Sequence, residues 1–373
     1  MKHRITRIHV KGFRSIREVE LAPGPITVLI GPNGAGKSNL LAFLKLVSLA
    51  RTQSLQRFIG TSGRASGLLH YGPSVTREVE FRLDFQDEKD RQNSYFARLG
   101  YAAGDTLIFL DEAVEFRTPG FPKPKHHSLG AGHAESRLPE DKTDETALVV
   151  NSLVAKMNFF HFHDTSLTSA LRAASRKVDD RFLRSDGSNL AAFLYRLATA
   201  DDAGFKASFN RITATLRRIA PFIKRLEPEL SDAANPEKAT VLLRWVDEGD
   251  HRFGAHDLSD GTLRAVALVT ALLQPPATLP MFITIDEPEL GLHPAALSLL
   301  ASIIRSVSTH AQVLVATQSS SLLDHFEPEE VVVAERAEGA TQLRRLDVPA
   351  LQQWREKYSL SELYDKNVLG GRP

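Results

Sequence analysis

The chain has 373 residues, of which 42% are hydrophobic, with a formal net charge of +1 and no cysteine. This length and apolar content are enough for one large globular domain or two smaller ones. The lack of cysteine excludes disulfides, thiolate metal sites and a cysteine nucleophile, and the near-neutral charge excludes a global attraction to nucleic acid. Because no apolar run approaches the roughly 20 residues needed to span a bilayer and the N-terminus lacks a signal-peptide core, we expect a cytoplasmic protein without a membrane partner.

The first 117 residues predict the N-terminal part of a nucleotide-binding core with an antiparallel β layer. Ile5 to Val10 alternates apolar and polar residues, and Val19 to Leu21 resumes after a turn at Gly12 to Ser15, which predicts a strand pair. The apolar run Pro25 to Ile30 predicts a further strand, and Asn39 to Ala50 predicts a helix. The alternating stretches that predict the antiparallel layer are 77–85, 95–99, 106–110 and 113–117.

Between that strand and that helix, Gly31 to Ser38 read GPNGAGKS. Glycines allow successive backbone N–H groups to close around a polyphosphate, and the helix directs its partially positive N-terminus at the same anion. Lys37 can then reach the outer phosphates, and the Ser38 hydroxyl can bind Mg²⁺. The sequence therefore predicts a phosphate-binding loop.

The middle of the chain predicts two further regions. Residues 118–147 are rich in Pro, Gly, His, Lys and Glu without an apolar period, which predicts an exposed, mobile loop. His126, His127 and His133 lie there; a metal site is one interpretation, but nothing apolar orients the imidazoles. Residues 148–235 have helical periodicity and predict a helical insertion.

The insertion carries many cationic side chains. They form either a solvated helix face or a surface for nucleic acid or another acidic partner. These side chains are Arg172, Arg176, Arg181, Arg184, Arg211, Arg217, Arg218, Lys224 and Arg225.

Residues 236–373 predict the C-terminal part of the nucleotide-binding core, because strands and helices alternate and this implies a parallel sheet with helices on its faces. The predicted strands are 240–245, 281–285 and 312–316, and the predicted helices are 262–273 and 294–307. After Leu323 we expect a short strand, a helix and a glycine-containing tail, without an appended nuclease motif.

Two segments of this region could carry chemistry. An apolar strand ends in Asp286 and Glu287; there Asp286 can hold a Mg²⁺-bound water and Glu287 can face an attacking water, although a solvated turn is the alternative. Ser259, in the segment LSDGT, is a plausible N-cap, and Gly261 permits close backbone approach. A second anion-binding helix start and an ordinary capped helix are both compatible with that segment.

The order of GPNGAGKS, LSDGT, FITIDEPELGLHP and VLVATQSSSLL resembles the Walker A, signature, Walker B with D-loop, and switch segments of ABC-type ATPases. It is most similar to the SMC/RecF/OLD-like branch of stand-alone predicted AAA-type ATPases. The resemblance covers residues 1–50 and 240–323. It implies an α/β fold, namely an ABC-type P-loop ATPase head with a mostly parallel core sheet, an antiparallel β layer and a helical insertion.

By this resemblance the cofactors are ATP and Mg²⁺. Ser38 and Asp286 would hold the Mg²⁺, Glu287 would be the general base, and Lys37 would act on the phosphates. Ser259, Asp260 and Gly261 would act in trans on the nucleotide of a second protomer, which implies a homodimer in the ATP state. The implied phosphate contacts in the same chain are Arg14, Ser15, Asn33, Gly34, Ala35, Gly36, Lys37, Ser38 and Asn39.

The chain departs from the family pattern at two places. Gln318 stands where many relatives carry histidine; its amide can orient water but cannot carry charge, so we expect slow hydrolysis. The glutamine expected where the strand meets the helical lobe has no match, and FFHFHDT occupies that place. His163 or Asp164 could replace it as a metal or water contact, or be merely structural.

The predicted function is an ATP-driven switch whose head-to-tail dimer closes on ATP and reopens on hydrolysis. Coupling to DNA maintenance or anti-phage defence is the first hypothesis. The second is an ATP-gated scaffold that holds or releases a separately encoded effector protein, for example one from the same operon. A transporter motor subunit is weaker, because the insertion and the β layer leave less room for a simple transporter pattern.

Overall fold

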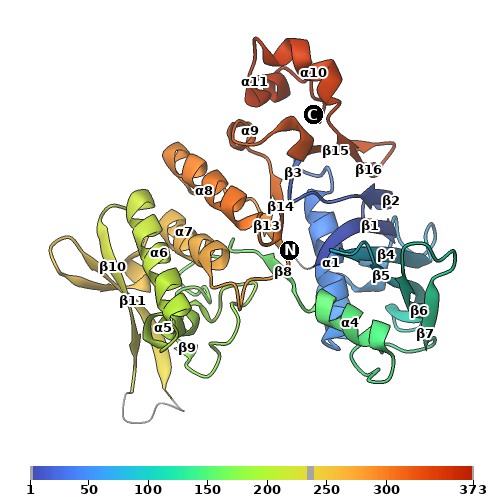
Figure 1. Cartoon of the computed structure of the whole chain (residues 1–373), viewed down its shortest axis with the longest axis horizontal. Coiled ribbons are helices and arrows are strands. Elements are labelled where there is room, and N and C mark those ends of the chain that lie inside the picture. Colours follow the sequence, from blue (N-terminus) through green and yellow to red (C-terminus); the bar gives the residue numbers. More distant parts are fainter. Residues whose placement is uncertain (1–2, 233–238, 372–373) are drawn as a thin grey trace. The chain divides into compact units, whose positions relative to one another are not determined.

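The computed structural model describes residues 3–232 and 239–371, which divide into two compact units (Figure 1). The first unit comprises residues 1–158, 280–284 and 311–373, and the second comprises 159–279 and 285–310, as far as they are described. Each unit is therefore assembled from segments that are distant in the sequence.

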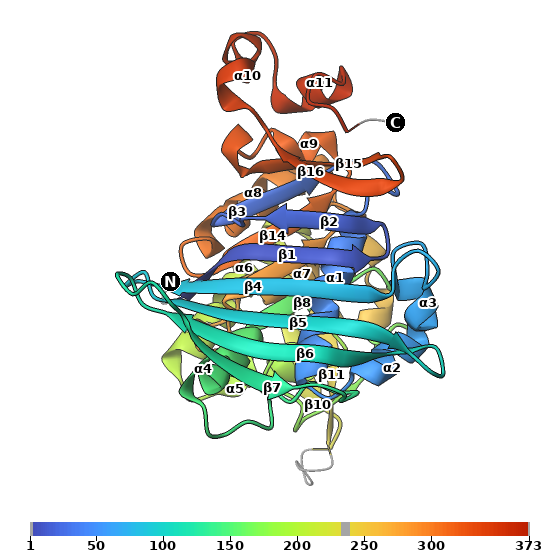
Figure 2. The same cartoon turned by 90° about the vertical axis from the view of Figure 1, so that its right-hand side faces the viewer.

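The first unit contains a six-stranded antiparallel sheet in the order β2-β1-β4-β5-β6-β7, seen face-on in Figure 2. Its strands are β1 (His3–Phe13), β2 (Ile16–Leu21), β4 (Glu78–Asp87), β5 (Gln92–Ala102), β6 (Thr106–Arg117) and β7 (Lys125–Gly130). The predicted antiparallel layer is thus confirmed. The prediction of an exposed, mobile loop over 118–147 is wrong at β7. The sequence of this segment has no apolar period, but its backbone pairs with β6 and therefore forms a strand.

Helix α1 (Lys37–Arg51) packs on the apolar face of this sheet through a chain of aromatic rings. The ring centroid of Phe43 lies 6.0 Å from that of Phe13 and 5.5 Å from that of Phe81, and Phe81 lies 5.3 Å from Tyr95. Edge-on pairs of this kind contribute about 0.5–1.5 kcal/mol each beyond burial. This packing fixes the helix that follows the phosphate loop.

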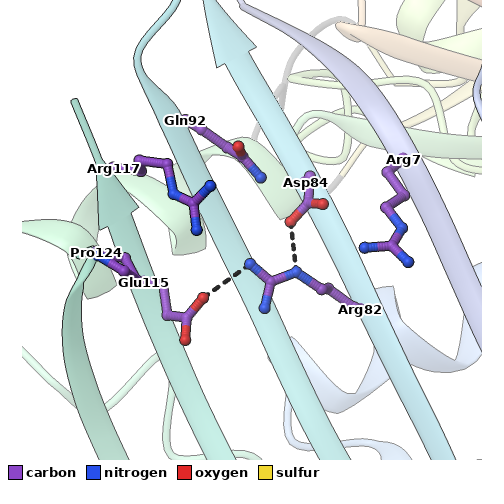
Figure 3. A pocket seen from close by; sticks show the side chains of 7 residues that line it. All are labelled: Arg7, Arg82, Asp84, Gln92, Glu115, Arg117 and Pro124. Carbon is purple, nitrogen blue, oxygen red and sulfur yellow. Dashed lines mark hydrogen bonds and ion pairs between the residues drawn. The ribbon is translucent and has the colours of Figure 1, made fainter. Parts of the chain in front are cut away.

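The other face of the sheet is polar and carries a hollow of about 480 Å³ (Figure 3). Arg82 crosses its floor and donates to Asp84 and Glu115 at 2.8 Å each. The positive charge of Arg82 is therefore neutralised by carboxylates of the same sheet. The residues that line the hollow are Arg7, Arg82, Asp84, Gln92, Glu115, Arg117 and Pro124.

A second sheet has the order β16-β15-β3-β14-β13-β8. Strand β3 (Ile26–Ile30) pairs in parallel with β14 (Gln312–Thr317) and β15 (Val331–Ala337), and β16 (Ala340–Arg345) pairs antiparallel with β15. Strands β8 (Met157–Phe160) and β13 (Phe282–Asp286) begin in the first unit and end in the second. Strands β3 and β14 are buried along their whole length, as expected for the centre of a parallel α/β sheet.

Short elements complete the first unit. They are α2 (Leu55–Thr61), α3 (Arg64–Leu68), α4 (Glu145–Val154), α9 (Ser320–Leu323), η2 (Pro328–Glu330), α10 (Val348–Arg355) and α11 (Leu360–Asp365).

As far as it is described, the second unit combines a small antiparallel sheet with four α-helices and one 3₁₀ helix. The sheet has the order β10-β11-β12, and β9 also pairs with β11. Its strands are β9 (Ser175–Arg176), β10 (Ile223–Leu230), β11 (Thr240–Asp247) and β12 (Arg252–Gly254). The helical elements are α5 (Leu190–Thr199), α6 (Ala203–Ile219), η1 (Ala255–Asp257), α7 (Asp260–Leu273) and α8 (Pro294–Val307).

This arrangement corrects two predicted boundaries. The segment 148–235 is not a purely helical insertion, because α4 belongs to the first unit and β9 and β10 lie within the segment. Strand β11, predicted to return to the core sheet, instead pairs with β10. Hydrophobic alternation identifies a strand but does not name its partner, so the sequence could not decide either point.

The part of the chain that the structure describes contains no helix with both the length and the apolar character needed to cross a bilayer.

Candidate nucleotide-binding active site

The phosphate loop lies in the first unit between β3 and α1, as the sequence predicts. Helix α1 begins after Gly36, which has φ +103° and no side chain to cap the helix. A Cβ at this position would collide with Thr341 Oγ1 and would lie 2.8 Å from Ser15 Oγ. Only glycine fits here, and the first helical turn keeps its positive end toward the loop.

Lys37 is buried, with 5% of its surface exposed. Its ammonium donates to the carbonyl oxygens of Gly31 at 2.6 Å and Pro32 at 3.1 Å. Carbonyls of the loop therefore hold the Lys37 ammonium at the place where the motif predicts that phosphate oxygens bind. Asn33, Gly34 and Ser38 are exposed, whereas Ala35 is buried and its amide closes the turn onto Pro32.

Distant residues brace the end of the loop. The Asn39 side-chain amide donates to Ser15 Oγ at 2.6 Å, and Ser15 Oγ lies 2.7 Å from Thr341 Oγ1. The Thr341 amide donates to the Ser15 carbonyl at 2.8 Å. Thr341 was missed by sequence reasoning, and no local signal marks it, because it stands 326 residues from Ser15.

Arg14 and Gln318 also lie in the first unit. Arg14 has φ +48°, and its carbonyl accepts a hydrogen bond from His70 Nδ1 at 2.7 Å. Burial lowers the pKa of the Arg14 guanidinium, but an arginine side chain stays charged in proteins. Gln318 is half-buried and follows β14 directly.

The acidic pair lies where β13 ends in the second unit. The Asp286 side chain is 10% exposed. Glu287 has φ +46°, which is a left-handed conformation that costs a non-glycine residue about 1–3 kcal/mol and persists where the surroundings impose it. Such strain clusters at functional sites, and here it turns the chain sharply directly after the strand.

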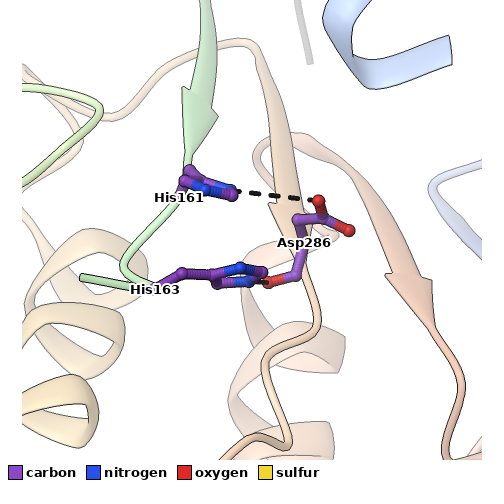
Figure 4. Close-up of side chains that lie close together, drawn as sticks. All are labelled: His161, His163 and Asp286. Atoms are coloured by element: carbon purple, nitrogen blue, oxygen red, sulfur yellow. Dashed lines mark hydrogen bonds and ion pairs between the residues drawn. The ribbon is translucent and has the colours of Figure 1, made fainter. Parts of the chain in front are cut away.

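Two histidines lie beside Asp286 (Figure 4). His161 Nδ1 is 3.9 Å from Asp286 Oδ2, and His163 Nε2 is 3.1 Å from the Asp286 carbonyl oxygen. The two imidazole centroids are 4.0 Å apart, and one ligand atom from each of the three residues lies within 4.8 Å of the others. We call these three residues the His-His-Asp cluster.

The cluster contains only one of the two predicted metal candidates. His163 belongs to it, but Asp164 is exposed and accepts hydrogen bonds from the Ser166 hydroxyl at 2.7 Å and amide at 3.1 Å. These bonds lower the pKa of the Asp164 carboxyl. His161 takes its place; the signal that could have found it is the spacing of two residues, which puts alternate side chains of an extended segment on one face.

The signature segment also lies in the second unit. Ser259 is the N-cap of α7 and accepts a hydrogen bond from the Thr262 amide at 3.2 Å, so the predicted cap is present. A Cβ at Gly261 would collide with the Gly291 carbonyl oxygen, so this glycine is already required by packing within the unit. Ser259 and Asp260 are exposed.

The guanidinium of Arg172 holds the signature segment in place. It donates to the carbonyls of Ala255 at 2.6 Å and Leu258 at 3.0 Å, and to Asp260 at 2.8 Å. The side chain is only 3% exposed. The prediction that Arg172 belongs to a solvated or nucleic-acid-binding face is therefore wrong, because buried carbonyls consume its donors.

Arg264 joins the signature helix to the other functional segments of the unit. It donates to the carbonyls of Phe162 at 2.9 Å, His163 at 3.0 Å and Leu290 at 2.8 Å. One guanidinium thus ties the segment that bears the His-His-Asp cluster to the turn after Glu287. Sequence reasoning assigned Arg264 no role, because its partners are carbonyls about 26 and 100 residues away.

The three histidines of 118–147 do not form a metal site. His126, His127 and His133 each lie beside a different carboxylate, at 3.3 Å from Glu115, 2.6 Å from Asp141 and 2.8 Å from Glu112. Within residues 3–232 and 239–371, the His-His-Asp cluster alone has the spacing of a metal-binding group.

Comparison with known proteins places this geometry in a family. The family model described as "AAA domain, putative AbiEii toxin, Type IV TA system" matches residues 26–324. The chain is 35% identical to an OLD nuclease of Thermus scotoductus over 96 residues, which are 22% of this chain and 18% of that protein. It is 40% identical to the DNA replication and repair protein RecF of Anaeromyxobacter dehalogenans over 87 residues, which are 21% of this chain and 23% of that protein.

A longer match joins the chain to the Old nuclease of Escherichia phage P2, with 22% identity over 357 residues, 87% of this chain and 58% of that protein. The matches thus span less than two thirds of the length of each of these three relatives.

Two solved structures share the fold. One is an SMC head bound to the C-winged helix domain of ScpA, with a TM-score of 0.60 at 14% identity over 94% of this chain and 99% of that chain. The other is an SMC head with an extended coiled coil bound to the C-terminal domain of ScpA, from Pyrococcus furiosus, with a TM-score of 0.60 at 14% identity over 95% of this chain and 99% of that chain. Since the family model covers most of the chain, the protein belongs to the family of AAA domains described as putative AbiEii toxin, Type IV TA system, and is an ABC-type ATPase of the SMC/RecF/OLD branch.

Proposed function

We propose that this protein is a switch that binds and hydrolyses ATP and that dimerises head-to-tail in the ATP state. The observation that carries the proposal is the phosphate loop, in which Lys37 is buried and Gly36 leaves room that a Cβ would fill. This arrangement fits a nucleotide polyphosphate with Mg²⁺, which supplies charge neutralisation during phosphoryl transfer.

Within that proposal each residue has a defined task. Lys37 and the exposed amides of the loop bind phosphates, while Ser38 and Asp286 would hold Mg²⁺. Glu287 accepts a proton from the attacking water. Gln318 orients that water without contributing charge, and slow hydrolysis follows.

The trans role of the signature segment rests on its exposure. Ser259 and Asp260 are exposed at the N-terminus of the 14-residue helix α7, and Arg172 and Arg264 hold this end of the helix in place. A helix start fixed in this way can meet an anion that another protomer carries. The proposed dimer therefore buries two nucleotides, each between one phosphate loop and the partner's signature segment.

Size-exclusion chromatography with light scattering tests the dimer. Glu287→Gln should elute as a dimer with ATP and Mg²⁺ and as a monomer without them, because hydrolysis no longer reopens the dimer. Adding Ser259→Arg should abolish the dimer by placing bulk and charge against the partner's nucleotide. Ser302→Arg, on an exposed position of α8, is the matched control and should dimerise normally. An oligomer of constant size under all conditions would contradict the proposal.

We further propose that the switch is coupled to DNA maintenance or anti-phage defence. Support comes from the similarity to RecF and to OLD nucleases and from one face of α6. With 3.6 residues per turn, the eleven-residue interval puts Lys206 and Arg217 on one stripe of the helix, and the seven-residue interval puts Arg211 and Arg218 on a second stripe. Both stripes lie on the side of α6 opposite its buried residues Phe205, Ser208, Ile212 and Leu216. All four are exposed and have no carboxylate partner among residues 3–232 and 239–371.

Other cations of this unit neutralise neighbouring carboxylates. Arg184 pairs with Asp179 at 2.8 Å, and Arg225 with Glu227 at 2.6 Å. This contrast identifies the exposed face of α6 as the candidate DNA surface. Arg172 is excluded from that surface by its burial.

The test replaces Lys206, Arg211, Arg217 and Arg218 with glutamine. Each lost phosphate contact should flatten the dependence of log Kd on log salt by about 0.9 on duplex DNA, with basal ATPase unchanged. The matched control replaces four paired cations, Arg184, Lys224, Arg225 and Arg244, and removes the same charge. If the parent protein shows no salt-sensitive binding to single- or double-stranded DNA, with or without ATP, the DNA proposal fails.

In that case the second candidate is an ATP-gated scaffold for a separately encoded effector protein. The observation that favours it is that the two SMC heads described above were solved with a domain of another protein, ScpA, bound to them. Native purification from the source cells with mass spectrometry tests it. An effector should co-purify with Glu287→Gln in ATP and dissociate from the parent protein after hydrolysis.

A further inference from the structure

We propose that the His-His-Asp cluster, formed by His161, His163 and Asp286, is a binding site for a divalent first-row transition ion, in the range from Mn²⁺ to Zn²⁺. Two imidazoles and one carboxylate are donors that such ions prefer, whereas Mg²⁺ prefers oxygen donors and retains water. The three side chains in Figure 4 thus offer two nitrogen donors, which a Mg²⁺ site does not require.

The distances allow the three donors to converge on one ion. A metal with bonds near 2.1 Å separates neighbouring donor atoms by about 3–3.5 Å. His161 Nδ1 and Asp286 Oδ2 are 3.9 Å apart, so a small side-chain rotation closes this pair around an ion. One ring nitrogen of each histidine and one carboxylate oxygen of Asp286 already lie within 4.8 Å of one another.

Hydrogen bonds preset the orientation of His163. Its Nε2 is 3.1 Å from the Asp286 carbonyl oxygen, and since a carbonyl only accepts, Nε2 carries the proton and the lone pair is on Nδ1. Histidines that bind metals are commonly held in this way, with one ring nitrogen donating to a carbonyl or carboxylate. Arg264 fixes the backbone on both sides of the His163 Cα by donating to the carbonyls of Phe162 and His163.

The environment also leaves room for further ligands. Asp286 is 10% exposed, while His161 is 57% exposed and forms the solvent side of the cluster. Three protein ligands on one side and solvent on the other match a site that keeps open positions for water or an external oxygen ligand. Because Asp286 is also the proposed Mg²⁺ ligand of the ATPase, the consequence for hydrolysis rests on the proposed function; metal binding itself does not.

Metal titration of the untagged, EDTA-treated full chain without nucleotide tests the proposal. Co²⁺ should bind in a 1:1 ratio with a visible absorption band, and Mn²⁺ and Co²⁺ should bind at least about 10-fold more tightly than Mg²⁺ in calorimetry, following the affinity order for nitrogen-bearing sites. His161→Gln and His163→Gln should each weaken Co²⁺ binding by at least about 10- to 100-fold, the loss that follows when even outer partners of metal ligands are removed.

The matched control is His310→Gln, which removes an exposed histidine three residues after the end of α8 and should leave Co²⁺ binding unchanged. His161 is exposed, so its substitution should leave the thermal midpoint unchanged and report on the metal alone. Equal affinities for Mg²⁺ and Co²⁺, or equal Co²⁺ binding by the parent and both cluster variants, would overturn the proposal. If Co²⁺ binds but ATP does not, the proposed function fails and the metal site stands; if ATP is hydrolysed with Mg²⁺ and Co²⁺ does not bind, only the metal site fails.

Discussion

The phosphate loop and the His-His-Asp cluster reach their geometry by different routes. The loop is one contiguous stretch of eight residues, and its lysine is hydrogen-bonded to carbonyls only five and six positions away. The cluster combines two histidines that are close together in the sequence with Asp286, which stands 123 residues from His163, and Arg264 holds its backbone from a third segment. A contiguous site should respond to changes in its own backbone, whereas an assembled site should respond to residues that touch no ligand.

The largest effect that bears on this comparison is expected at Glu287. Replacing it with glutamine keeps the shape and removes the base, so the rate of ATP hydrolysis should fall by about 10²- to 10⁴-fold while ATP binding at the phosphate loop persists. Steady-state phosphate release and binding of a fluorescent ATP analogue measure the two quantities separately. Glu248→Gln, at an exposed turn, is the control. A parent-like rate would remove Glu287 from the base role.

The next effect separates two glycines of the phosphate loop. Gly36→Ala should weaken ATP binding strongly, because the left-handed backbone costs about 1–2 kcal/mol and the collision with Thr341 Oγ1 adds about 1–3 kcal/mol of overpacking. Gly34→Ala should incur only the backbone cost, since φ is +81° but no other atom lies within 4 Å of the added Cβ. The dissociation constant for ATP and the thermal midpoint of both variants decide the matter. Equal losses would show that the residues around Gly36 yield and that the loop is set by its own backbone alone.

A smaller effect tests the assembled half through Arg172. Arg172→Gln leaves the carbonyls of Ala255 and Leu258 without their donor, and unsatisfied buried groups of this kind cost about 1–3 kcal/mol each. The variant should melt at a lower temperature and dimerise poorly with ATP, although each protomer still binds ATP. Arg176→Gln, at an exposed position, should stay within about 0.5 kcal/mol of the parent. Similar behaviour of both variants would mean that the signature segment, like the phosphate loop, is held by local contacts.

The sequence by itself determined the phosphate loop, the strand before it and the helix after it, because contiguous motifs and hydrophobic periods report local structure directly. It also determined the strand that ends in Asp286 and the N-cap at Ser259, which the structure places at Phe282–Asp286 and at the start of α7. The same reasoning could not find β7, since the histidines and lysine of that strand have no apolar period and only pairing with β6 makes it a strand.

Tertiary structure alone decided which polar residues near the site are buried and which of them meet. Arg172 reads as one of nine insertion cations, but carbonyls 83 and 86 residues away turn it into a support of the signature segment. From the sequence, Asp164 and His161 are equally plausible as partners of His163. In the structure, Asp164 is hydrogen-bonded to Ser166, whereas His161 lies beside Asp286 at the end of β13. The physical reason is common to both cases: a side chain's charge and donors are local properties, whereas the partners that use them are supplied by segments that only the folded chain brings together.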